Sequence, residues 1–330
     1  MVYTRYMITK EELQGKKIII RADLDVPIKG GQVENTFRLE SILPTIELSL
    51  KHAHRTLLIG HMGRPEGEDP AFSLAPVQQW LKRRLNQDIP LITSGFSPGE
   101  WWTGEHSISL LENLRFFPGE NAQDRGFASD ISSGADIYIY EAFASYHSCA
   151  SMRIIPEIVP TVTGIRFDLE AATLSKVTQN PAHPTLLIAS GAKADKLKII
   201  ESLTPRFDSV LLGGKFARPE HLTPDGLDLN QPGIDSFIQA ISQAQTIVLN
   251  GPLGKYEDHE HDKATRAIFQ ALKDSRSFTV MGGGDTLAAI PALGFDYADF
   301  SFVSTGGGAM LEFLASSTHP LLEVLKSVKR

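Results

Sequence analysis

The chain of 330 residues is long enough for two ordinary domains, and its 42% apolar and 22% charged residues are typical of a globular protein. Its formal net charge of −7 argues against a general nucleic-acid or anionic-membrane binder, because phosphate backbones are held by an excess of lysine and arginine. The single cysteine, Cys149, cannot form an intrachain disulfide, and the opening MVYTRYMITKEELQG lacks the long apolar core of a signal peptide. No window reaches the roughly 18 consecutive apolar residues of a membrane span. We therefore expect a cytoplasmic protein.

Short apolar runs alternate with helix-length segments along the whole chain. The first half offers the strands KKIIIRADL, RTLLIGHM, SISLLENL and DIYIYEAF, with helices over Phe37–His52 and Ala75–Leu85. An amphipathic segment over residues 167–179 then predicts a connecting helix. The second half offers the strands TLLIASG, SVLLGG, TIVLNG, FTVMGGG and FSFVSTGGG, with helices over residues 234–244 and 262–273.

This alternation predicts βαβ units and a parallel sheet in each half. We expect an α/β protein of two Rossmann-like lobes, each a parallel sheet flanked by helices, joined by a hinge helix. The predicted boundary lies near residue 165, which gives lobes of residues 1–165 and 166–330.

Ligands of open parallel sheets bind beyond the carboxyl ends of the strands, so the residues there are the informative ones. In the first half these residues are polar or basic: Asp23, Asp25, His61, Arg64, Asn113 and Arg115. Together with Arg38, two of these arginines are expected to converge at one sheet edge, where three guanidinium groups suit a small anion bearing phosphate or carboxylate. Each arginine alone would rather indicate a surface salt bridge.

In the second half the strand ends are rich in glycine. They hold Lys193, Gly213, Gly214, Asn250, Gly251, Gly282, Gly283, Gly284, Asp285, Gly306, Gly307 and Gly308. Glycine-rich turns that open a helix leave backbone N–H groups free to bind phosphate, and two of them suggest a polyphosphate. Neither turn matches the common P-loop or dinucleotide fingerprint. A single triplet would favour close helix–strand packing instead.

Three further features have a functional and a structural interpretation. Asp285 could hold Mg²⁺ on a nucleotide phosphate or serve as a helix cap. Lys193 could contribute charge to a phosphoryl group or be merely solvated. His259 and His261 lie two residues apart rather than on one helix face, which favours a solvated acidic turn over a metal site.

Six ordered motifs between residues 21 and 314 resemble those of phosphoglycerate kinase: RADLDVP, GHMGRP, LLENLRFFPGE, LNGPLG, MGGGDT and VSTGGGAMLEFL. The resemblance implies a monomeric, hinge-closing glycolytic enzyme. Its N-terminal lobe would bind 3-phosphoglycerate or 1,3-bisphosphoglycerate, and its C-terminal lobe would bind ADP or ATP with Mg²⁺. The tail over residues 315–330 would return to the first lobe.

The resemblance also implies roles for individual residues. The phosphoglycerate would be bound by Asp23, Asp25, Arg38, His61, Arg64 and Arg115. The nucleotide would be bound by Lys196, Gly213, Gly214, Asn250, Glu257, Gly283, Gly284, Asp285, Thr286, Gly306, Gly307 and Gly308, with Asp285 as the metal ligand. Arg38 and Lys193 would stabilise charge in the transition state, because phosphoryl transfer depends on positioning and electrostatics.

The chain also departs from the family pattern. Asp25 replaces the usual Asn, and an added negative charge beside an anionic substrate weakens binding unless it is paired or protonated. In ASYHSCAS the family's substrate arginine is replaced by Ser148, with Arg153 as a nearby substitute. SGAKADK is one residue short, Lys215 replaces a family glycine, and several dozen residues that help wall the adenine pocket are missing between GGKFA and TPDGLDL. Two alternatives therefore stand beside an active kinase: a catalytically weak relative that serves as a binding protein, and a kinase for another small carboxylate.

Overall fold

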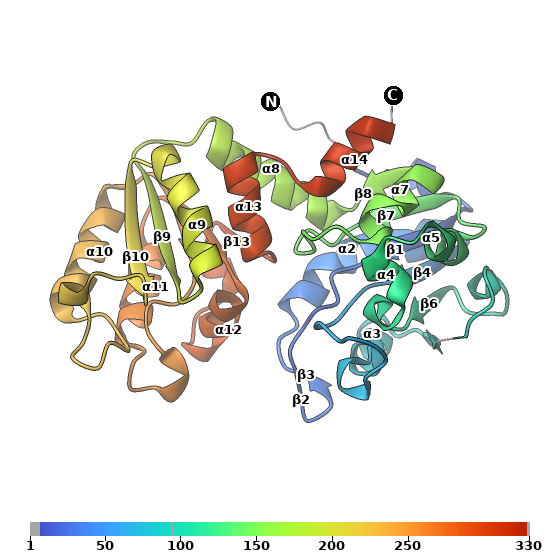
Figure 1. Cartoon of the computed structure of the whole chain (residues 1–330), viewed down its shortest axis with the longest axis horizontal. Coiled ribbons are helices and arrows are strands. Elements are labelled where there is room, and N and C mark those ends of the chain that lie inside the picture. Colours follow the sequence, from blue (N-terminus) through green and yellow to red (C-terminus); the bar gives the residue numbers. More distant parts are fainter. Residues whose placement is uncertain (1–6, 94, 329–330) are drawn as a thin grey trace. The chain divides into compact units, whose positions relative to one another are not determined.

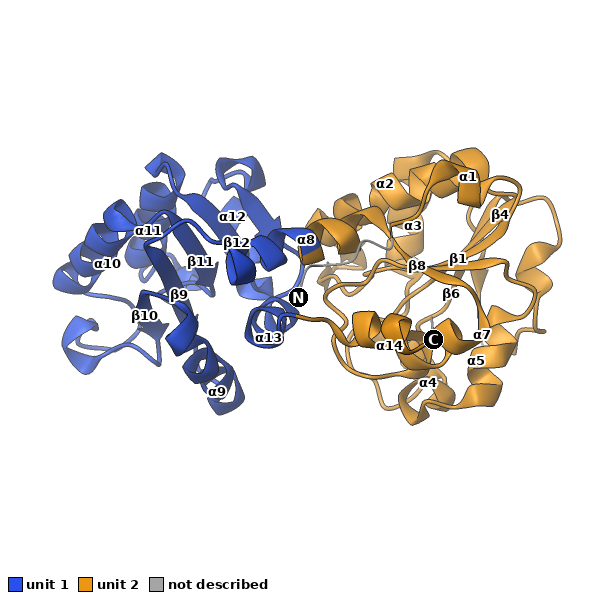
Figure 2. Cartoon of the chain, turned by 90° about the horizontal axis from the view of Figure 1, so that it is seen from above, with its two compact units in different colours: residues 1–2, 172–317 blue, residues 3–171, 318–330 orange. Residues whose placement is uncertain are grey.

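The computed structural model describes residues 7–93 and 95–328, which form two compact units. Unit 1 holds residues 172–317, and unit 2 holds residues 7–171 and 318–328 (Figure 2). The division falls inside helix α8 (Ile165–Gln179), the predicted connecting helix, rather than at its start. The last two residues of the predicted tail, 329 and 330, lie outside the described residues. No helix of the described part is long and apolar enough to cross a membrane.

Unit 2 is built on a six-stranded parallel sheet in the order β5-β6-β4-β1-β7-β8 (Figure 1). Its strands are β1 (Lys17–Arg21), β4 (Arg55–Ile59), β5 (Leu91–Ile92), β6 (Ile108–Leu111), β7 (Ile137–Tyr140) and β8 (Thr161–Thr163). The central strands are almost entirely buried, as expected of a parallel sheet covered on both faces. The edge strands β5 and β8 and the small hairpin β2 (Ile28–Lys29) and β3 (Gln32–Val33) were not predicted, because two or three residues make no recognisable apolar run.

Two groups of helices cover the two faces of this sheet (Figure 2). On one face lie α1 (Lys10–Leu13), α2 (Phe37–His52) and α3 (Ala75–Leu85). On the other lie α4 (Pro118–Ala122), α5 (Arg125–Ser132), α6 (Ala150–Arg153), α7 (Ile155–Ile158) and α14 (Pro320–Val328). The bounds of α2 and α3 are those predicted, because each presents an apolar stripe to the core at helical spacing.

Unit 1 is built on a five-stranded parallel sheet in the order β10-β9-β11-β12-β13. Its strands are β9 (Thr185–Gly191), β10 (Ser209–Gly214), β11 (Thr246–Asn250), β12 (Phe278–Gly282) and β13 (Phe302–Ser304). Helices α9 (Ala194–Leu203) and α13 (Gly308–Ser316) lie on one face, and α10 (Gln231–Gln243), α11 (Lys263–Asp274) and α12 (Gly284–Ala292) lie on the other (Figure 2). The predicted fold class, two parallel sheets flanked by helices, is confirmed. Helix α10 begins three residues earlier than predicted, because Asn230 is its N-cap residue. The Asn230 side chain accepts a hydrogen bond from the Gly233 N–H.

The start of α8 is held by a buried carboxylate. Glu141, which follows β7, accepts hydrogen bonds from the backbone N–H groups of Arg166 at 2.9 Å and Phe167 at 3.0 Å. The hydroxyl of Thr45 in α2 donates to the same carboxylate at 2.5 Å. Burial raises the pKa of Glu141 to about 7. The first turn of the connecting helix is therefore tied to β7 and α2 of unit 2.

His319 holds the C-terminal segment on unit 2. Its Nδ1 accepts the Leu321 N–H at 3.1 Å, so Nε2 carries the proton and donates to the Phe143 carbonyl at 3.2 Å. The ring is fully buried, and burial lowers its pKa to about 3. Four aromatic rings surround it, with centroids 4.9–6.2 Å away: Tyr140, Phe143, Tyr146 and Phe167.

Replacing His319 by Gln is expected to flatten the pH dependence of stability. In the unfolded chain the imidazole binds a proton below its ordinary pKa of 6.5, whereas the buried ring stays neutral down to about 3. Native stability is therefore lost as pH falls, by about 2 kcal/mol from about pH 7 to about pH 5. All three tryptophans, Trp80, Trp101 and Trp102, lie in unit 2, so urea unfolding followed by their fluorescence reports this unit. Equal pH slopes for the wild type and His319→Gln would contradict the neutral buried ring.

Candidate active site

Basic side chains gather beyond the carboxyl ends of β1, β4 and β6 in unit 2. His61 and Arg64 follow β4, Arg115 lies in a short 3₁₀ turn (Leu114–Phe116) after β6, and Arg38 lies in the first turn of α2. Burial and the positive charges of Arg21, Arg115, Arg38 and Arg64 lower the pKa of His61 well below its ordinary value. The structure thus brings together the arginines that the sequence predicted to converge. We call Arg38, Arg64, Arg115 and His61 the arginine cluster.

The negative charge of Asp25 is paired. Its Oδ1 accepts the Gly63 N–H at 2.9 Å, and its Oδ2 lies 3.9 Å from Nη1 of Arg38. Arg38 also donates from Nη1 to the Asp25 carbonyl at 2.5 Å, which fixes the guanidinium at the end of β1. Asp25 therefore orients Arg38. Its carboxylate is also paired, and a paired carboxylate is tolerable beside an anion.

Asp23 is a buried carboxylate without a hydrogen-bond donor in the described part of unit 2. Only 2% of the residue is exposed, and neither carboxylate oxygen has a hydrogen-bond partner among the described residues. The nearest cation is Nε of Arg38, 3.7 Å from Oδ2, and burial raises the pKa of Asp23. A buried acceptor without a donor is costly, so it suits a ligand hydroxyl or amide.

Asn113 and Arg115 differ in role. Asn113 is fully buried, and its Nδ2 donates to the carbonyls of Met62 at 2.8 Å and Phe72 at 2.9 Å, so it fastens the turn after β4 to the end of β6. Arg115 is only half-buried and donates to the carbonyl of Gly63. Asn113 is thus a scaffold residue rather than a ligand-binding one.

Arg21 is a residue of this site that the sequence analysis missed. It ends β1 with 1% exposure, and its Nη2 lies 2.6 Å from Nδ1 of His61. Its other donors reach the Ala22 carbonyl at 2.7 Å and the Ser151 hydroxyl at 3.1 Å. The signal in the sequence is a charged residue at the end of an otherwise apolar strand, which is rare unless the charge has partners.

In the segment ASYHSCAS, Ser148 contacts the nearby Arg153. Ser148 is exposed and accepts a hydrogen bond from Nε of Arg153 at 3.1 Å. Arg153 is exposed in the last turn of α6. The guanidinium group of Arg153 therefore lies beside Ser148.

In unit 1, three helices begin at the carboxyl edge of the sheet without a capping side chain. The N-cap residues are Lys193 for α9, Gly283 for α12 and Gly307 for α13, and none makes a side-chain cap hydrogen bond. The first N–H groups of an α-helix have no partner inside the helix, and the helix dipole adds positive potential there. This edge is therefore suited to an anion with several oxygens. We call these three helix starts the uncapped edge.

The glycines of this edge fall into two groups. A Cβ on Gly307 would lie 2.8 Å from Cα of Gly283, so two turns pack backbone against backbone there. A Cβ on Gly282 would meet Sδ of Met310 at 2.6 Å. By contrast, a Cβ on Gly284 or Gly308 would meet nothing within 4 Å. Packing thus explains Gly282 and Gly307 but leaves Gly284 and Gly308 facing open space.

Asn250 and Thr286 bind these turns together. Nδ2 of Asn250 donates to the Gly307 carbonyl at 3.2 Å. The Thr286 hydroxyl, which is fully buried, donates to the Gly282 carbonyl and accepts the Gly251 N–H, both at 2.9 Å. The turns after β11, β12 and β13 are therefore fixed relative to one another. At the end of β10, Gly213 and Gly214 pack against Leu253 and Ser190.

The two lysines of SGAKADK occupy different environments. Nζ of Lys196 donates to the Ser190 carbonyl at 2.5 Å and the Asn250 carbonyl at 3.3 Å, and burial lowers its pKa to about 8 against the opposing charge of Asp285. Lys193 is exposed at the start of α9, and Asp285 is exposed in the first turn of α12. Glu257 is exposed in a short turn (Tyr256–Asp258) after β11.

The predicted solvated acidic turn around His261 is instead an ion-paired clamp. His261 reaches Asp258 from Nδ1 and Asp225 from Nε2, each at 2.9 Å, and both carboxylates raise its pKa. His261 thereby joins the loop before α10 to the loop after β11. Among the described residues, no group of three or more His, Cys, Asp or Glu side chains has the geometry of a metal site.

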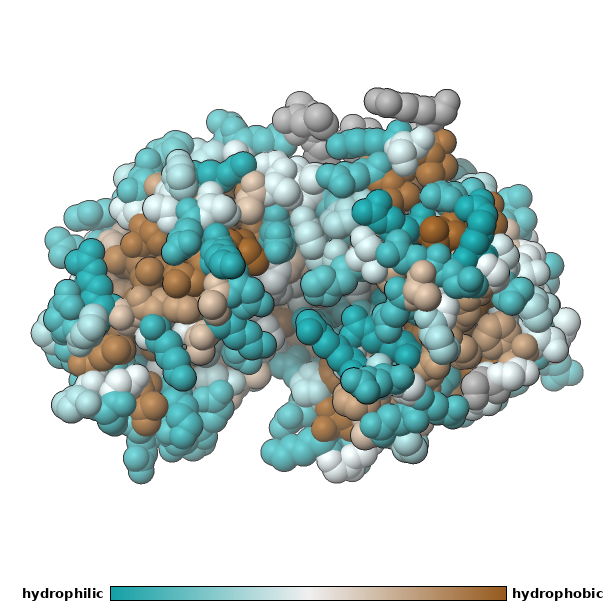
Figure 3. Space-filling view, viewed as in Figure 1, coloured by the Kyte–Doolittle hydropathy of each residue, from teal (hydrophilic) through white to brown (hydrophobic). Residues whose placement is uncertain are grey.

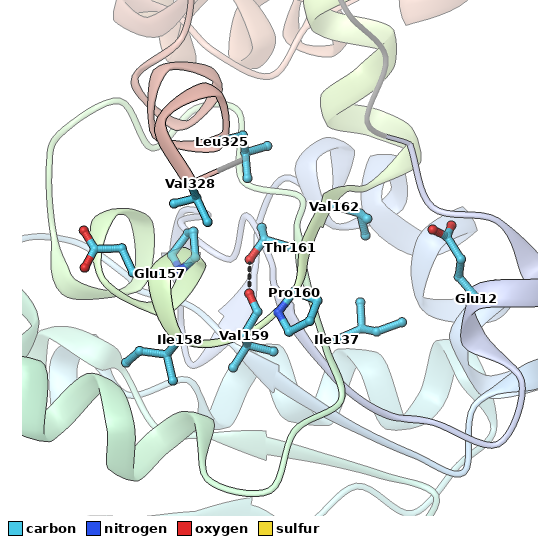
Figure 4. Close-up of a pocket in the computed structure, with 11 residues that line it drawn as sticks. Glu12, Ile137, Glu157, Ile158, Val159, Pro160, Thr161, Val162, Leu325 and Val328 are labelled. Atoms are coloured by element: carbon cyan, nitrogen blue, oxygen red, sulfur yellow. Dashed lines mark hydrogen bonds between the residues drawn. The ribbon is translucent and has the colours of Figure 1, made fainter. Parts of the chain in front are cut away.

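A groove of about 440 Å³ lies at the opposite end of the unit 2 sheet (Figure 4). It is formed at the amino ends of β7 and β8 and by α14, and Figure 3 shows apolar side chains exposed in this region. Its lining includes Ile137, Ile158, Val162, Leu325 and Val328. The charged side chains among its lining residues, Glu12 and Glu157, are acidic, so the groove does not suit the anions that the arginine cluster fits.

Comparison with known proteins agrees with this architecture of two parallel α/β units. The phosphoglycerate kinase family matches in two stretches, residues 8–219 and 219–317. A phosphoglycerate kinase of Leifsonia xyli is 31% identical over 390 aligned positions that cover 95% of this chain and 97% of the relative. The phosphoglycerate kinase structure from Coxiella burnetii has a TM-score of 0.81 at 27% identity and covers 98% and 99% of the two chains. The one from Pyrococcus horikoshii, at 24% identity and a TM-score of 0.85, covers 96% and 98% and supports the fold alone.

The fold defines a two-unit α/β protein with its candidate ligand sites at the carboxyl edges of its sheets. The chain belongs to the phosphoglycerate kinase family.

The comparisons also locate the segment that this chain lacks. The family match divides at residue 219, between GGKFA and TPDGLDL, and the alignment with the Leifsonia relative is longer than the 330 residues of this chain. Here β10 is an edge strand whose Val210, Leu211 and Leu212 are only partly buried. Figure 3 shows an apolar area on unit 1 in the region of β9 and β10. The shortened connection leaves that strand partly uncovered.

Alanine is expected to affect stability differently in the two groups of glycines. Gly307→Ala is expected to destabilise the protein by about 1–3 kcal/mol, because its Cβ would collide with Gly283. Gly308→Ala is expected to change stability by less than about 0.5 kcal/mol, because its Cβ enters open space. Calorimetric melting of the two variants measures this difference. A similar loss of melting temperature in both would contradict the assignment.

Proposed function

We propose that the chain is an active phosphoglycerate kinase. It transfers a phosphoryl group reversibly between 1,3-bisphosphoglycerate with ADP and 3-phosphoglycerate with ATP, with Mg²⁺ on the nucleotide. The observation that carries the proposal is the uncapped edge, where three helix starts face outward and Gly284 and Gly308 have no packing reason to be glycine. Membership of the family supplies the reaction class. The cytoplasmic location and the monomeric state remain predictions from the sequence.

The arginine cluster of unit 2 is the proposed phosphoglycerate site. Three guanidinium groups match the phosphate and the carboxylate of this substrate, and Asp23 offers its unpartnered carboxylate to the substrate hydroxyl. Arg153, resting on Ser148, supplies the charge that the family's missing arginine would bring. Asp25 leaves the site electrostatically favourable because Arg38 and the Gly63 N–H compensate it.

The uncapped edge of unit 1 is the proposed site for the nucleotide phosphates. The first N–H groups of α9, α12 and α13 donate hydrogen bonds to phosphate oxygens, and Gly284 and Gly308 allow these oxygens to approach closely. Lys196, held on the carbonyls at the ends of β9 and β11, provides one positive charge, and the exposed Lys193 provides a second. Glu257 is the proposed ribose contact.

Asp285 fits the role of the metal-binding residue. It is an exposed carboxylate in the first turn of α12, beside the open Gly284, and Mg²⁺ prefers one or two carboxylates with phosphate oxygens. When bound, the ion supplies charge neutralisation for the nucleotide phosphates. The residues of this chain do the rest by positioning: Arg38 and Lys193 stabilise negative charge on the phosphoryl group in transfer, and no side chain becomes a covalent nucleophile.

The base end of the nucleotide site is where this chain differs most from its relatives. The connection after β10 is short, and Lys215 and Phe216 follow its two glycines directly. The ring of Phe216 lies over Gly191, since a Cβ there would meet the Phe216 Cε2 at 3.1 Å. We infer that Phe216 provides part of the wall that the missing segment forms in the family.

The proposal predicts turnover in a coupled assay with 3-phosphoglycerate, ATP and Mg²⁺. Lys193→Ala and Arg38→Ala are each expected to lower kcat by about 10²–10³, the effect of removing one charge-stabilising group. Lys255→Ala, which removes an exposed lysine paired with Asp258, serves as the control. Absence of turnover at millimolar substrates, or full activity of Lys193→Ala, would refute an active kinase of this mechanism.

Calorimetry with ADP separates the anion site from the metal site. Gly308→Ala is expected to weaken ADP binding about tenfold with or without Mg²⁺, because its Cβ obstructs phosphate approach. Asp285→Asn is expected to weaken binding only when Mg²⁺ is present. ADP binding without phosphoglycerate turnover would point to a kinase for another small carboxylate. Absence of ADP binding would point to a non-catalytic relative.

A further inference from the structure

A buried chain of four polar side chains runs behind the arginine cluster of unit 2. Its members are Glu120 in α4, Ser151 in α6, Arg21 in β1 and His61 after β4, with exposures of 2%, 0%, 1% and 9%. Only His61 belongs to the proposed phosphoglycerate site. The other three residues are buried behind it and come from three separate elements.

The hydrogen bonds along this chain run in one direction. The Arg21 Nε donates to the Ser151 Oγ at 3.1 Å, so the single hydroxyl proton of Ser151 is left for Oε1 of Glu120, 2.6 Å away. Oε2 of Glu120 accepts the backbone N–H of Ser151 at 3.0 Å. Glu120 therefore holds Ser151 at two points, and Ser151 presents its lone pair to Arg21.

The contact between Arg21 and His61 decides where the His61 proton lies. A guanidinium has only donors, so Nδ1 of His61, 2.6 Å from Arg21 Nη2, must be the acceptor. The proton of the neutral ring is then on Nε2. A second proton on Nδ1 would remove the acceptor and place a positive charge against Arg21 in a buried site.

The charged groups around both residues agree with this assignment. His61 is faced by the arginines of β1, α2, its own loop and the turn after β6: Arg21, Arg38, Arg64 and Arg115. Arg21 is faced by the carboxylates of Glu120 and Asp23, whose negative charge offsets the cost of burying the guanidinium, and by Tyr138, Tyr140 and Cys149, which burial keeps protonated by raising their pKa. Of these, Glu120 has its carboxylate bound to the residue that holds Arg21.

We propose that Glu120 and Ser151 are positioning residues that hold Arg21 against His61, and thereby keep His61 as a neutral ring that donates from Nε2 to the substrate anion. The inference rests on the proposed function only for the identity of that anion. The tautomer and its dependence on Ser151 are properties of the unliganded protein. Neither Glu120 nor Ser151 touches the substrate.

The first test is the nitrogen NMR signal of His61 in the unliganded protein, assigned by its loss in His61→Gln. In the wild type we expect an unprotonated Nδ1 and a protonated Nε2 that show no titration near the ordinary histidine pKa of 6.5, because burial and the neighbouring guanidinium groups lower the pKa. In Ser151→Ala and Glu120→Gln, Arg21 loses its support and His61 is expected to titrate nearer its ordinary pKa of 6.5. A wild-type Nδ1–H tautomer, or identical titration in all three proteins, would overturn the inference.

The second test is kinetic. Ser151→Ala and Glu120→Gln are expected to raise KM for 3-phosphoglycerate about tenfold, the effect of one hydrogen bond to a charged group, with a new pH dependence below about pH 7 and kcat changed far less. Ser132→Ala is the matched control, because Ser132 is also buried in unit 2 but donates only to the Ala128 carbonyl. An equal KM rise in the control, or an unchanged KM in both variants, would contradict a positioning role.

The two tests separate this inference from the proposed function. If the protein shows no kinase activity but His61 changes its titration in Ser151→Ala, the positioning role of Ser151 is supported and the proposed function is refuted. Glu120→Gln keeps the size of the side chain, so it provides the answer if Ser151→Ala fails to fold. Tryptophan fluorescence of unit 2 verifies folding of each variant.

Discussion

Parallel strand pairing is the constraint on which both units depend. Each strand must be followed by a crossover before the next parallel strand begins, so the carboxyl ends of all strands in a sheet fall at one edge. In unit 2 this edge gathers His61, Arg64 and Arg115 from segments far apart in the chain. In unit 1 it gathers the starts of α9, α12 and α13. The same geometry thus produces a site of side-chain cations in one unit and a site of backbone N–H groups in the other.

A buried cation shapes the interior of unit 2. Arg21 lies at the end of a strand whose other side chains are mostly apolar, and a charge there is tolerable only when its donors are satisfied and an opposite charge is near. Glu120 and Ser151 meet that need from α4 and α6. In consequence the segment after β7 is held to a buried cation that comes from β1.

Local contacts fix the segments around both candidate sites. Asp25 pairs with Arg38 and with a backbone N–H, so its carboxylate orients an arginine of the cluster. The short connection after β10 is fastened by the His261 clamp to the loop after β11. The turns of the uncapped edge are held together by the hydrogen bonds of Asn250 and Thr286.

The sequence by itself determined the nine main strands, the long helices, the fold class and the convergence of the arginines, because apolar periodicity and strand-end position are local signals. It missed β5 and β8, which are too short to carry a pattern, and Arg21, whose partners lie up to 130 residues away. Only the tertiary structure decided that Gly307 serves packing while Gly308 faces open space, and that Lys196 rather than Lys193 reaches the strand-end carbonyls. These outcomes depend on which atoms meet across distant turns, and no local pattern of residues contains that information.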